Sequence, residues 1–168
     1  MKNNLLQKIL ISLIVIGIIV VGIITAKAIM VKNVNSKKEI TAEEFKKKMS
    51  DKGYYISSII GEQSPKYLKS AYTAISKEQV YDIKFYEAET DEDALKNVFL
   101  KEKEAIEKEP NKKVEKDIKI KQYNYFKAEI NNKIYIVIKN GKTVIITKID
   151  KSKEKEVNQI LKEFNYIL

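Results

Sequence analysis

Four acidic residues lie at alternate positions in one short stretch of the chain, EAETDED, and could serve as ligands for a divalent cation. They are Glu87, Glu89, Asp91 and Asp93. Ca²⁺ and Mg²⁺ prefer carboxylate oxygens, although this stretch lacks the turn glycine and the distal bidentate glutamate of an EF-hand loop. Acidic residues in the first turn of a helix also interact favourably with the helix dipole. We therefore expect no metal site here, and we predict that Asp91 and Asp93 begin a helix.

A second pattern interleaves basic and aromatic residues in the stretch KIKQYNYFK, at 119–127. On a strand these side chains could share one face, where lysines would neutralise phosphates and tyrosines would stack on bases. Any solvent-facing antiparallel strand shows the same alternation, so we expect an ordinary half-buried strand and no nucleic-acid partner. The face in question comprises Lys119, Lys121, Tyr123, Tyr125 and Lys127, with Ile118, Ile120, Phe126 and Ala128 available for the core.

Ser152 and Lys155 have the S-x-x-K spacing that pairs a nucleophile with a base in some acyl-transfer enzymes. In a lysine-rich chain this spacing arises easily, and we predict instead that Ser152 caps the final helix. The sequence contains no Arg, His, Cys or Trp, which excludes Ser-His triads, thiol nucleophiles and the usual zinc ligands. We expect no catalytic residue and no cofactor. A hydrolase that uses Asp or Glu carboxylates remains an alternative.

The eighteen residues from Ile9 to Ala26 carry no charge and are nearly all aliphatic. As a helix they would extend about 27 Å at about 1.5 Å per residue, close to the thickness of a bilayer's hydrocarbon core. We therefore predict a short basic N-terminal tail at 1–8 and a transmembrane anchor at 9–30. A signal peptide cleaved after Ala28 is the alternative, but its hydrophobic region would be unusually long.

The charges that flank this segment give opposing indications of orientation. Lys2 and Lys8 precede it, whereas four lysines follow between residues 27 and 38, which favours a cytoplasmic domain on a strict positive-inside count. A short N-terminal tail is nevertheless the common arrangement for an exported domain, and long domains translocate largely regardless of charge. We expect the domain to lie outside the cytoplasmic membrane. A cytoplasm-facing regulatory tether remains an alternative.

Residues 31–39 are polar and unpatterned, so we predict a juxtamembrane linker there and a single domain at 40–168. Residues 31–168 hold 29 lysines and all 23 acidic residues, for a net charge of +6. The excess of positive charge is well mixed along the chain. It suits a protein, a peptide or an anionic envelope component as partner.

Helix signals divide the domain at three places. Thr41 and Glu44 predict a capping box, and Gly53 predicts the end of that first helix. Thr90 predicts the cap of a second helix that ends at Pro110. The final helix is indicated by apolar residues at helical spacing, namely Val157, Ile160, Leu161 and Phe164.

Extended segments fill the intervals between these helices. Tyr81, Ile83 and Phe85 alternate with polar residues, and four segments follow between residues 116 and 149, with tight turns predicted at Asn131–Asn132 and Asn140–Gly141. The run IYIVI at 134–138 is apolar on both faces, which predicts a central strand covered on each side. The fold class is therefore α+β, an antiparallel sheet in the order α-β-β-β-α-β-β-β-β-α.

Three stretches together resemble uncharacterised, single-pass membrane-anchored α+β domains of low-GC Gram-positive bacteria. They are ITAEEFKKKMSDKGY, QVYDIKFYEAETDEDALKNVF, and the closing hairpin with KEKEVNQILKEFNY. The resemblance covers nearly the whole soluble part, and it rests on helix caps and strand alternation rather than on reactive residues. It implies an architecture and no activity. We expect a noncatalytic binding or interaction module held at the membrane.

Protease added to intact spheroplasts is expected to digest the C-terminal domain without lysis, because an exported domain is accessible from outside. The size of any protected fragment shows how much of the chain the membrane shields from the protease. Lysed cells provide the control. Protection of the whole domain until lysis would contradict the exported orientation and favour the cytoplasmic alternative.

Overall fold

The computed structural model of the chain describes residues 15, 19, 25, 37–61 and 64–167. The predicted tail at 1–8 and anchor at 9–30 lie outside the described residues, apart from Val15, Ile19 and Thr25, which are helical. Among the helices of the described residues, none is long and apolar enough to cross a membrane. The chain divides into two compact units, Met1–Ser36 and Lys37–Leu168, so the folded unit begins shortly before the predicted start at Ile40.

The folded unit follows the predicted succession of elements. Its helices are α2 (Ala42–Asp51), α3 (Asp91–Asp93), the π-helix η1 (Ala94–Phe99), α4 (Leu100–Lys108), the 3-10 helix η2 (Lys151–Lys153) and α5 (Glu154–Glu163). Its strands are β1 (Tyr55–Ser58), β2 (Leu68–Ile75), β3 (Asp82–Ala88), β4 (Lys113–Ile120), β5 (Tyr123–Ile130), β6 (Lys133–Asn140) and β7 (Thr143–Asp150). The segments α3, η1 and α4 follow one another directly and replace the single predicted second helix.

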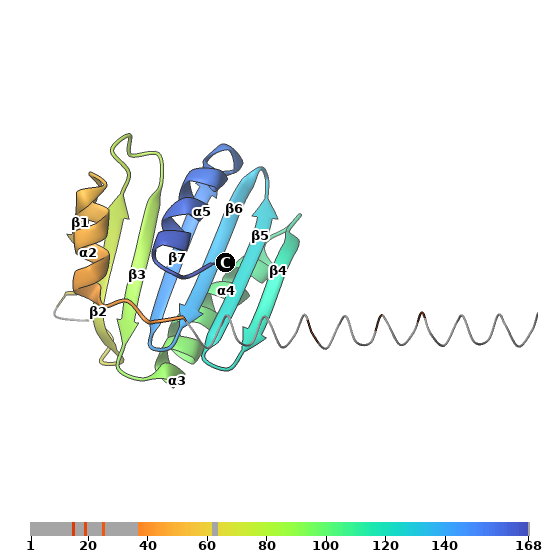
Figure 1. Cartoon of the computed structure of the whole chain (residues 1–168), viewed down its shortest axis with the longest axis horizontal. Coiled ribbons are helices and arrows are strands. Elements are labelled where there is room, and N and C mark those ends of the chain that lie inside the picture. The colour runs from red at the N-terminus through yellow and green to blue at the C-terminus, as the bar shows by residue number, and fades with distance from the viewer. Residues whose placement is uncertain (1–14, 16–18, 20–24, 26–36, 62–63, 168) are drawn as a thin grey trace, which may run out of the picture. The chain divides into compact units, whose positions relative to one another are not determined.

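All seven strands form one sheet in the order β1-β2-β3-β7-β6-β5-β4 (Figure 1), and each neighbouring pair is antiparallel. This confirms the α+β class and the antiparallel sheet. The last strand, β7, lies in the middle because it pairs with β6 on one side and with β3 on the other. The β3–β7 ladder, in which Phe85 lies opposite Ile145, therefore joins the first half of the unit to the second.

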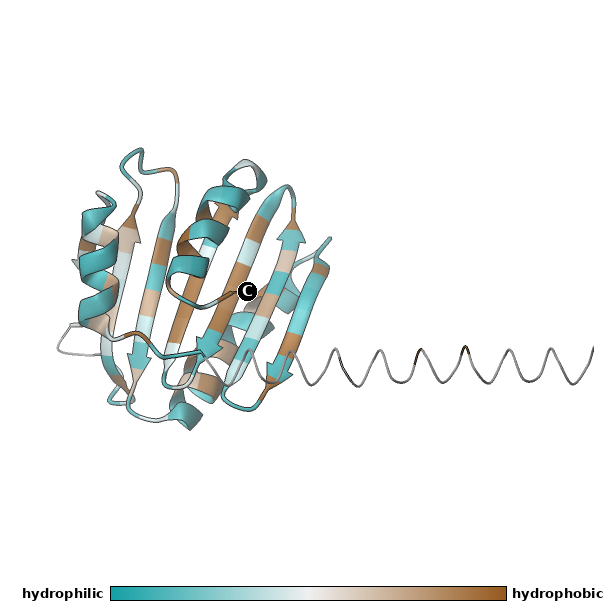
Figure 2. Cartoon of the chain, in the orientation of Figure 1, coloured by the Kyte–Doolittle hydropathy of each residue, from teal (hydrophilic) through white to brown (hydrophobic). Residues whose placement is uncertain are grey.

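One face of the sheet is covered by α2 and α5, whose outward sides are hydrophilic (Figure 2). Phe45 of α2 stacks on Phe85 of β3, with ring centroids 4.9 Å apart, and lies 5.7 Å from the ring of Phe164 at the end of α5. All three rings are fully buried. They connect both helices to the sheet at one point.

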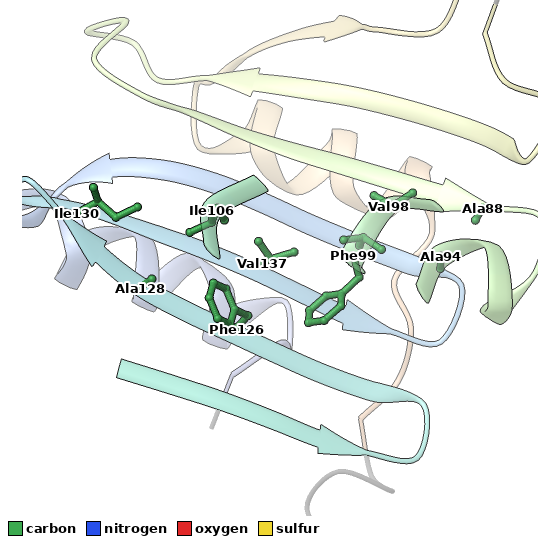
Figure 3. Packing of buried hydrophobic residues seen from close by; sticks show 10 residues of the cluster. Ala88, Ala94, Val98, Phe99, Ile106, Phe126, Ala128, Ile130 and Val137 are labelled. Carbon is green, nitrogen blue, oxygen red and sulfur yellow. The ribbon is translucent and has the colours of Figure 1, made fainter. Parts of the chain in front are cut away.

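The other face is covered by η1 and α4 through a second buried cluster (Figure 3). Phe99 and Ile106 from these helices pack with Phe126 of β5 and Val137 of β6. The alternate residues of β6, including Ile136, are also fully buried, so this strand is covered on both sides as predicted. It is an interior strand, although β7 and not β6 occupies the middle of the sheet.

The predicted helix signals act locally as expected. The backbone N–H of Glu44 donates to the Thr41 hydroxyl at 3.1 Å, and the Glu44 carboxylate accepts from the Thr41 N–H at 2.8 Å. At the other end Gly53 has a φ of +78°, and Tyr54 N–H donates to the Met49 carbonyl, which forms a Schellman motif. The Thr90 hydroxyl likewise accepts from Asp93 N–H.

The two predicted hairpin turns differ in outcome. Asn131 and Asn132 have φ values of 49° and 64°, as a type I′ turn requires. The prediction that Asn140 and Gly141 form a second such pair was wrong, since Asn140 belongs to β6 and pairs with Thr143. Gly141 and Lys142 are the central residues instead. Asn140 is fully buried, and its side-chain amide donates to the Lys38 carbonyl, which keeps it in the strand.

Replacing Phe45 by alanine is expected to lower the free energy of unfolding by about 3 to 5 kcal/mol, because the cavity cannot collapse between two further rings. Chemical denaturation of the purified chain measures the change. Val114→Ala, at a side chain that is 45% exposed, is the control and should change stability by less than about 0.5 kcal/mol. Equal losses for the two variants would contradict this account of the core.

Candidate functional site

Three of the four carboxylates singled out in the EAETDED stretch have different partners, and the fourth, Glu89, is exposed. Glu87 pairs with Lys69 at 2.7 Å, Asp91 pairs with Lys139 at 2.6 Å, and Asp93 accepts from the Thr90 hydroxyl and the Asn97 amide. Asp91 and Asp93 do begin a helix. Within the described ranges no group of three or more metal-ligating side chains is gathered. The role that the structure gives these carboxylates is to pair with lysines and to cap a helix.

Asp91 has a particular structural role because its partner is buried. The Lys139 side chain is only 1% exposed, and its ammonium donates to the Asp91 carboxylate and, at 3.0 Å, to the Gln122 carbonyl. A buried ammonium is costly unless it is paired and hydrogen-bonded. Asp91, in the first turn of this helical segment, therefore neutralises the buried ammonium of Lys139 near the end of β6.

The basic and aromatic stretch does not form one continuous exposed surface, since Lys119 and Lys121 are exposed but the two tyrosines are buried. Tyr123 and Tyr125 are 4% and 5% exposed, and the Tyr123 hydroxyl donates to the Tyr166 carbonyl at 2.8 Å. Burial raises the pKa of Tyr125 to about 12. Lys127 forms ion pairs with Glu115 and Glu154. The expectation of a solvent-facing side on this strand was wrong, because α5 covers it.

Ser152 and Lys155 are both exposed, and they lie in η2 and in the first turn of α5. Ser152 does not cap the final helix as predicted, since the N-cap position of α5 is Lys153 and no side-chain hydrogen bond caps it. Ser152 lies within the 3-10 helix η2, and α5 begins two residues later, at Glu154.

The clearest candidate for a binding site is a sheet surface that we call the open face. On the side of the sheet that carries η1 and α4, these helices pack over β3, β6 and β7 near Ala88 and Val137. Further along, cross-strand pairing brings together side chains that are exposed or half-buried. The open face comprises Tyr55, Ser57, Thr73, Ile75, Asp82, Lys84, Tyr86, Tyr135, Ile146 and Lys148.

The two faces of the same strands differ sharply in burial. Ile83, Phe85 and Ile145, which point toward α2 and α5, are fully buried. Their neighbours Tyr86 and Ile146, on the open face, are only half-buried. Residue type does not account for this difference, since both sets contain large apolar or aromatic side chains. The difference follows from which helices cover each face.

A cavity of about 210 Å³ lies where the open face meets the helical segment. Its lining residues are Tyr67, Leu68, Tyr86, Asn97, Val98, Lys101, Glu102 and Ile146. The Lys101 ammonium lies 5.7 Å from the centre of the Tyr67 ring. Burial and the nearby Glu102 carboxylate raise the pKa of the Tyr86 hydroxyl above its usual value. Three of the lining residues are aliphatic and the other five carry a hydroxyl, amide or charged group, so the cavity offers both apolar contact and hydrogen bonds.

The π-helix η1 supplies two of the lining residues, Asn97 and Val98. In this segment the N–H of Leu100 donates to the carbonyl of Leu95, five residues earlier. Short π-helical segments are rare and frequently occur at functional sites. The sequence was interpreted as a regular helix here. No glycine or proline marks the π-helix, so this part of the site could not be predicted from the residue pattern.

The described carboxylates with shifted pKa values do not resemble a catalytic acid. The pKa is lowered at Glu44, Glu129, Glu156 and Glu163, and the first cause in each case is a hydrogen bond to the ionised form. For Glu156 the donor is the Tyr81 hydroxyl, at 2.7 Å. A general acid needs a raised carboxyl pKa instead.

Comparison with known proteins finds no matching family model, no matching curated protein and no matching solved structure.

Replacing Asp91 by asparagine is expected to lower the free energy of unfolding by about 1 to 3 kcal/mol, because Lys139 would lose its anion while it stays buried. The matched variant Lys139→Met removes the buried ammonium and leaves the Asp91 carboxylate, whose side chain is 52% exposed, in contact with solvent, so it should cost less. Thermal or chemical denaturation measures both. A larger loss for Lys139→Met than for Asp91→Asn would contradict the pairing argument.

Proposed function

We propose that this chain is a membrane-tethered, extracytoplasmic and noncatalytic binding module, and that its open face binds a protein or peptide partner. The observation that carries the proposal is the uncovered half of the sheet with its cavity. Tyr86 and Ile146 of the open face remain half-buried, whereas Phe85 and Ile145, their neighbours in sequence, are fully buried on the opposite face. Exposed apolar surface of this kind marks interaction sites.

The hydrophobic run from Ile9 to Ala26 supports the tether. A module held at the membrane meets other membrane-associated or envelope partners at an increased effective concentration. Modest affinity at a small site is then sufficient. The resemblance to membrane-anchored bacterial domains agrees with this arrangement.

The size of the cavity favours a macromolecular partner over a free small ligand. Pockets for drug-sized ligands typically measure about 300 to 1,000 Å³, and a cavity of about 210 Å³ suits one side chain. Interfaces often depend on a few such anchors in well-packed pockets. The aliphatic lining from Leu68, Val98 and Ile146 favours an apolar or aromatic anchor.

The charges around the cavity favour a protein or peptide over an anionic polymer. Lys84, Lys101 and Lys148 are offset by Asp82 and Glu102, so the surface is mixed rather than uniformly basic. The Lys148 ammonium also lies 4.9 Å from the centre of the Tyr135 ring. Binding of a polyanion is strengthened by a surface of one sign of charge. Mixed charge instead suits a partner that presents both signs.

The test is selection of peptides from a displayed random library on the purified full-length chain in lipid nanodiscs, with polyglutamate as the anionic comparison. Selected peptides should share one aromatic or large aliphatic residue. Ile146→Trp, which fills the cavity, should weaken their binding at least tenfold because the anchor is excluded.

The matched control is Val114→Trp, which adds the same ring at an exposed position on β4 and should leave binding unchanged. Melting temperatures establish that both variants are folded. Binding of polyglutamate with no selected peptide, or equal peptide binding by Ile146→Trp and the unmodified chain, would overturn the proposal for this face.

A further inference from the structure

The two edges of the sheet differ in how they are protected from pairing with another chain. The edge strand β4 carries Lys113, Glu115, Lys116, Asp117 and Lys119. The opposite edge, β1, lies within residues 53–61 (GYYISSIIG), which contain no charged side chain. Charged residues on an edge strand deter edge-to-edge pairing. This protection is present on β4 and absent from β1.

Exposed apolar side chains gather at the unprotected edge. Tyr55 in β1 is 60% exposed, and Ile59 directly after β1 is 42% exposed. Val80, which precedes β3 at the end where Tyr55 pairs with Ile75, is 52% exposed. Among the described residues from Lys37 onward, Val114 is the one other exposed large hydrophobic residue. Two of these four side chains, Tyr55 and Ile59, therefore lie in β1 or directly after it, and Val80 lies in the turn between β2 and β3.

The backbone of β1 also has groups available for pairing. Ile59 N–H donates to the Ala71 carbonyl of β2 at 3.1 Å. The direction of hydrogen bonding alternates along an antiparallel strand, so Tyr55 and Ser57 also bond toward β2. Ile56 and Ser58 consequently direct their N–H and carbonyl groups away from the sheet, where the Ser58 carbonyl accepts a long hydrogen bond of 3.4 Å from the neighbouring Ser57 hydroxyl.

We propose that β1 pairs with β1 of a second copy of this chain, antiparallel, about a two-fold axis at Ser57. In this register Tyr55 of each copy lies opposite Ile59 of the other. Ile56 lies opposite Ser58, and their outward backbone groups exchange hydrogen bonds. The two Ser57 residues face each other as a non-hydrogen-bonded pair, in which Cα atoms are about 4.5 Å apart and a small side chain fits.

The pattern of β1 explains why the occupant is a second copy. A two-fold interface must be complementary to itself, and the order apolar, small, apolar at Tyr55, Ser57 and Ile59 has this property. Pairs of aromatic and β-branched residues across strands are favourable. No like charges meet across the axis, and the net positive charge of the unit is screened beyond about 10 Å at 0.1 M salt.

This pairing would extend the sheet across two molecules and place their open faces side by side. Tyr55 and Ser57 belong to the open face as well as to the edge, but none of the residues that line the cavity lies in β1, so the pairing does not depend on what binds in the cavity. The self-association and the partner site can therefore fail separately.

The test uses the absence of cysteine from the sequence, because a single introduced thiol is then the sole source of a disulfide. Full-length Ser57→Cys in its membrane should form a covalent dimer in most molecules under a mild oxidant. The expected Cα separation lies within the range of about 4.4 to 6.8 Å that disulfides span.

Ser58→Cys is the matched control, since it changes the same residue type at the next exposed position. In the proposed register Ser58 lies opposite Ile56 and away from its own counterpart, so its crosslinking should be at least fivefold lower. Val114→Cys on β4 measures random collision between tethered copies. Reduced Ser57→Cys should melt at the same temperature as the unmodified chain, which establishes that the edge is intact.

A second variant tests the association without crosslinking. Ser57→Lys places two ammonium groups at the axis, and sedimentation in detergent should change from dimer to monomer. The inference is overturned if Ser57→Cys crosslinks no more than Val114→Cys, if Ser58→Cys crosslinks better, or if the crosslinked product contains a different protein. It is also overturned if the unmodified chain is a monomer at every concentration.

Discussion

The structure depends on the burial of both faces of the strands β6 and β7. Ile136 and Val137 are neighbours in sequence, point to opposite sides of the sheet, and are both fully buried. A strand of this kind is stable only when each face is covered. The helices α2 and α5 supply one cover, and the segment from α3 to α4 supplies the other. The position of β7 beside β3 then fixes the sheet order, because it joins the two halves of the unit.

The described helices are too few to cover both faces of seven strands. One face has two helices, tied together through Phe45 and Phe164, whereas the other has a single helical segment placed over β3, β6 and β7. The uncovered remainder is the open face, and the strand farthest from that segment is β1. The candidate binding surface and the unprotected edge therefore have the same structural origin, namely incomplete cover on one side.

A chain whose basic residues are all lysine uses them in several structural roles. Lys139 is buried and neutralised by Asp91, Lys127 joins β5 to β4 and α5 through two glutamates, and Lys37 donates to the Asn165 carbonyl. Lysine forms such contacts as a point charge on a long apolar stem. This distribution explains why the net positive charge does not gather into one strongly basic surface.

The sequence by itself determined the features that depend on contacts within a few residues. Thr41 and Thr90 cap helices, and Ile83 and Phe85 alternate as a half-buried strand, since these signals need only neighbours along the chain. Tertiary structure alone decided that β7 lies between β3 and β6, that Tyr125 is buried while Tyr86 is only half-buried, and that a π-helix lines the cavity. Tyr86 and Tyr125 have similar alternating surroundings in sequence. Their burial depends on distant segments, because the helix that covers a strand is chosen by packing across the whole unit.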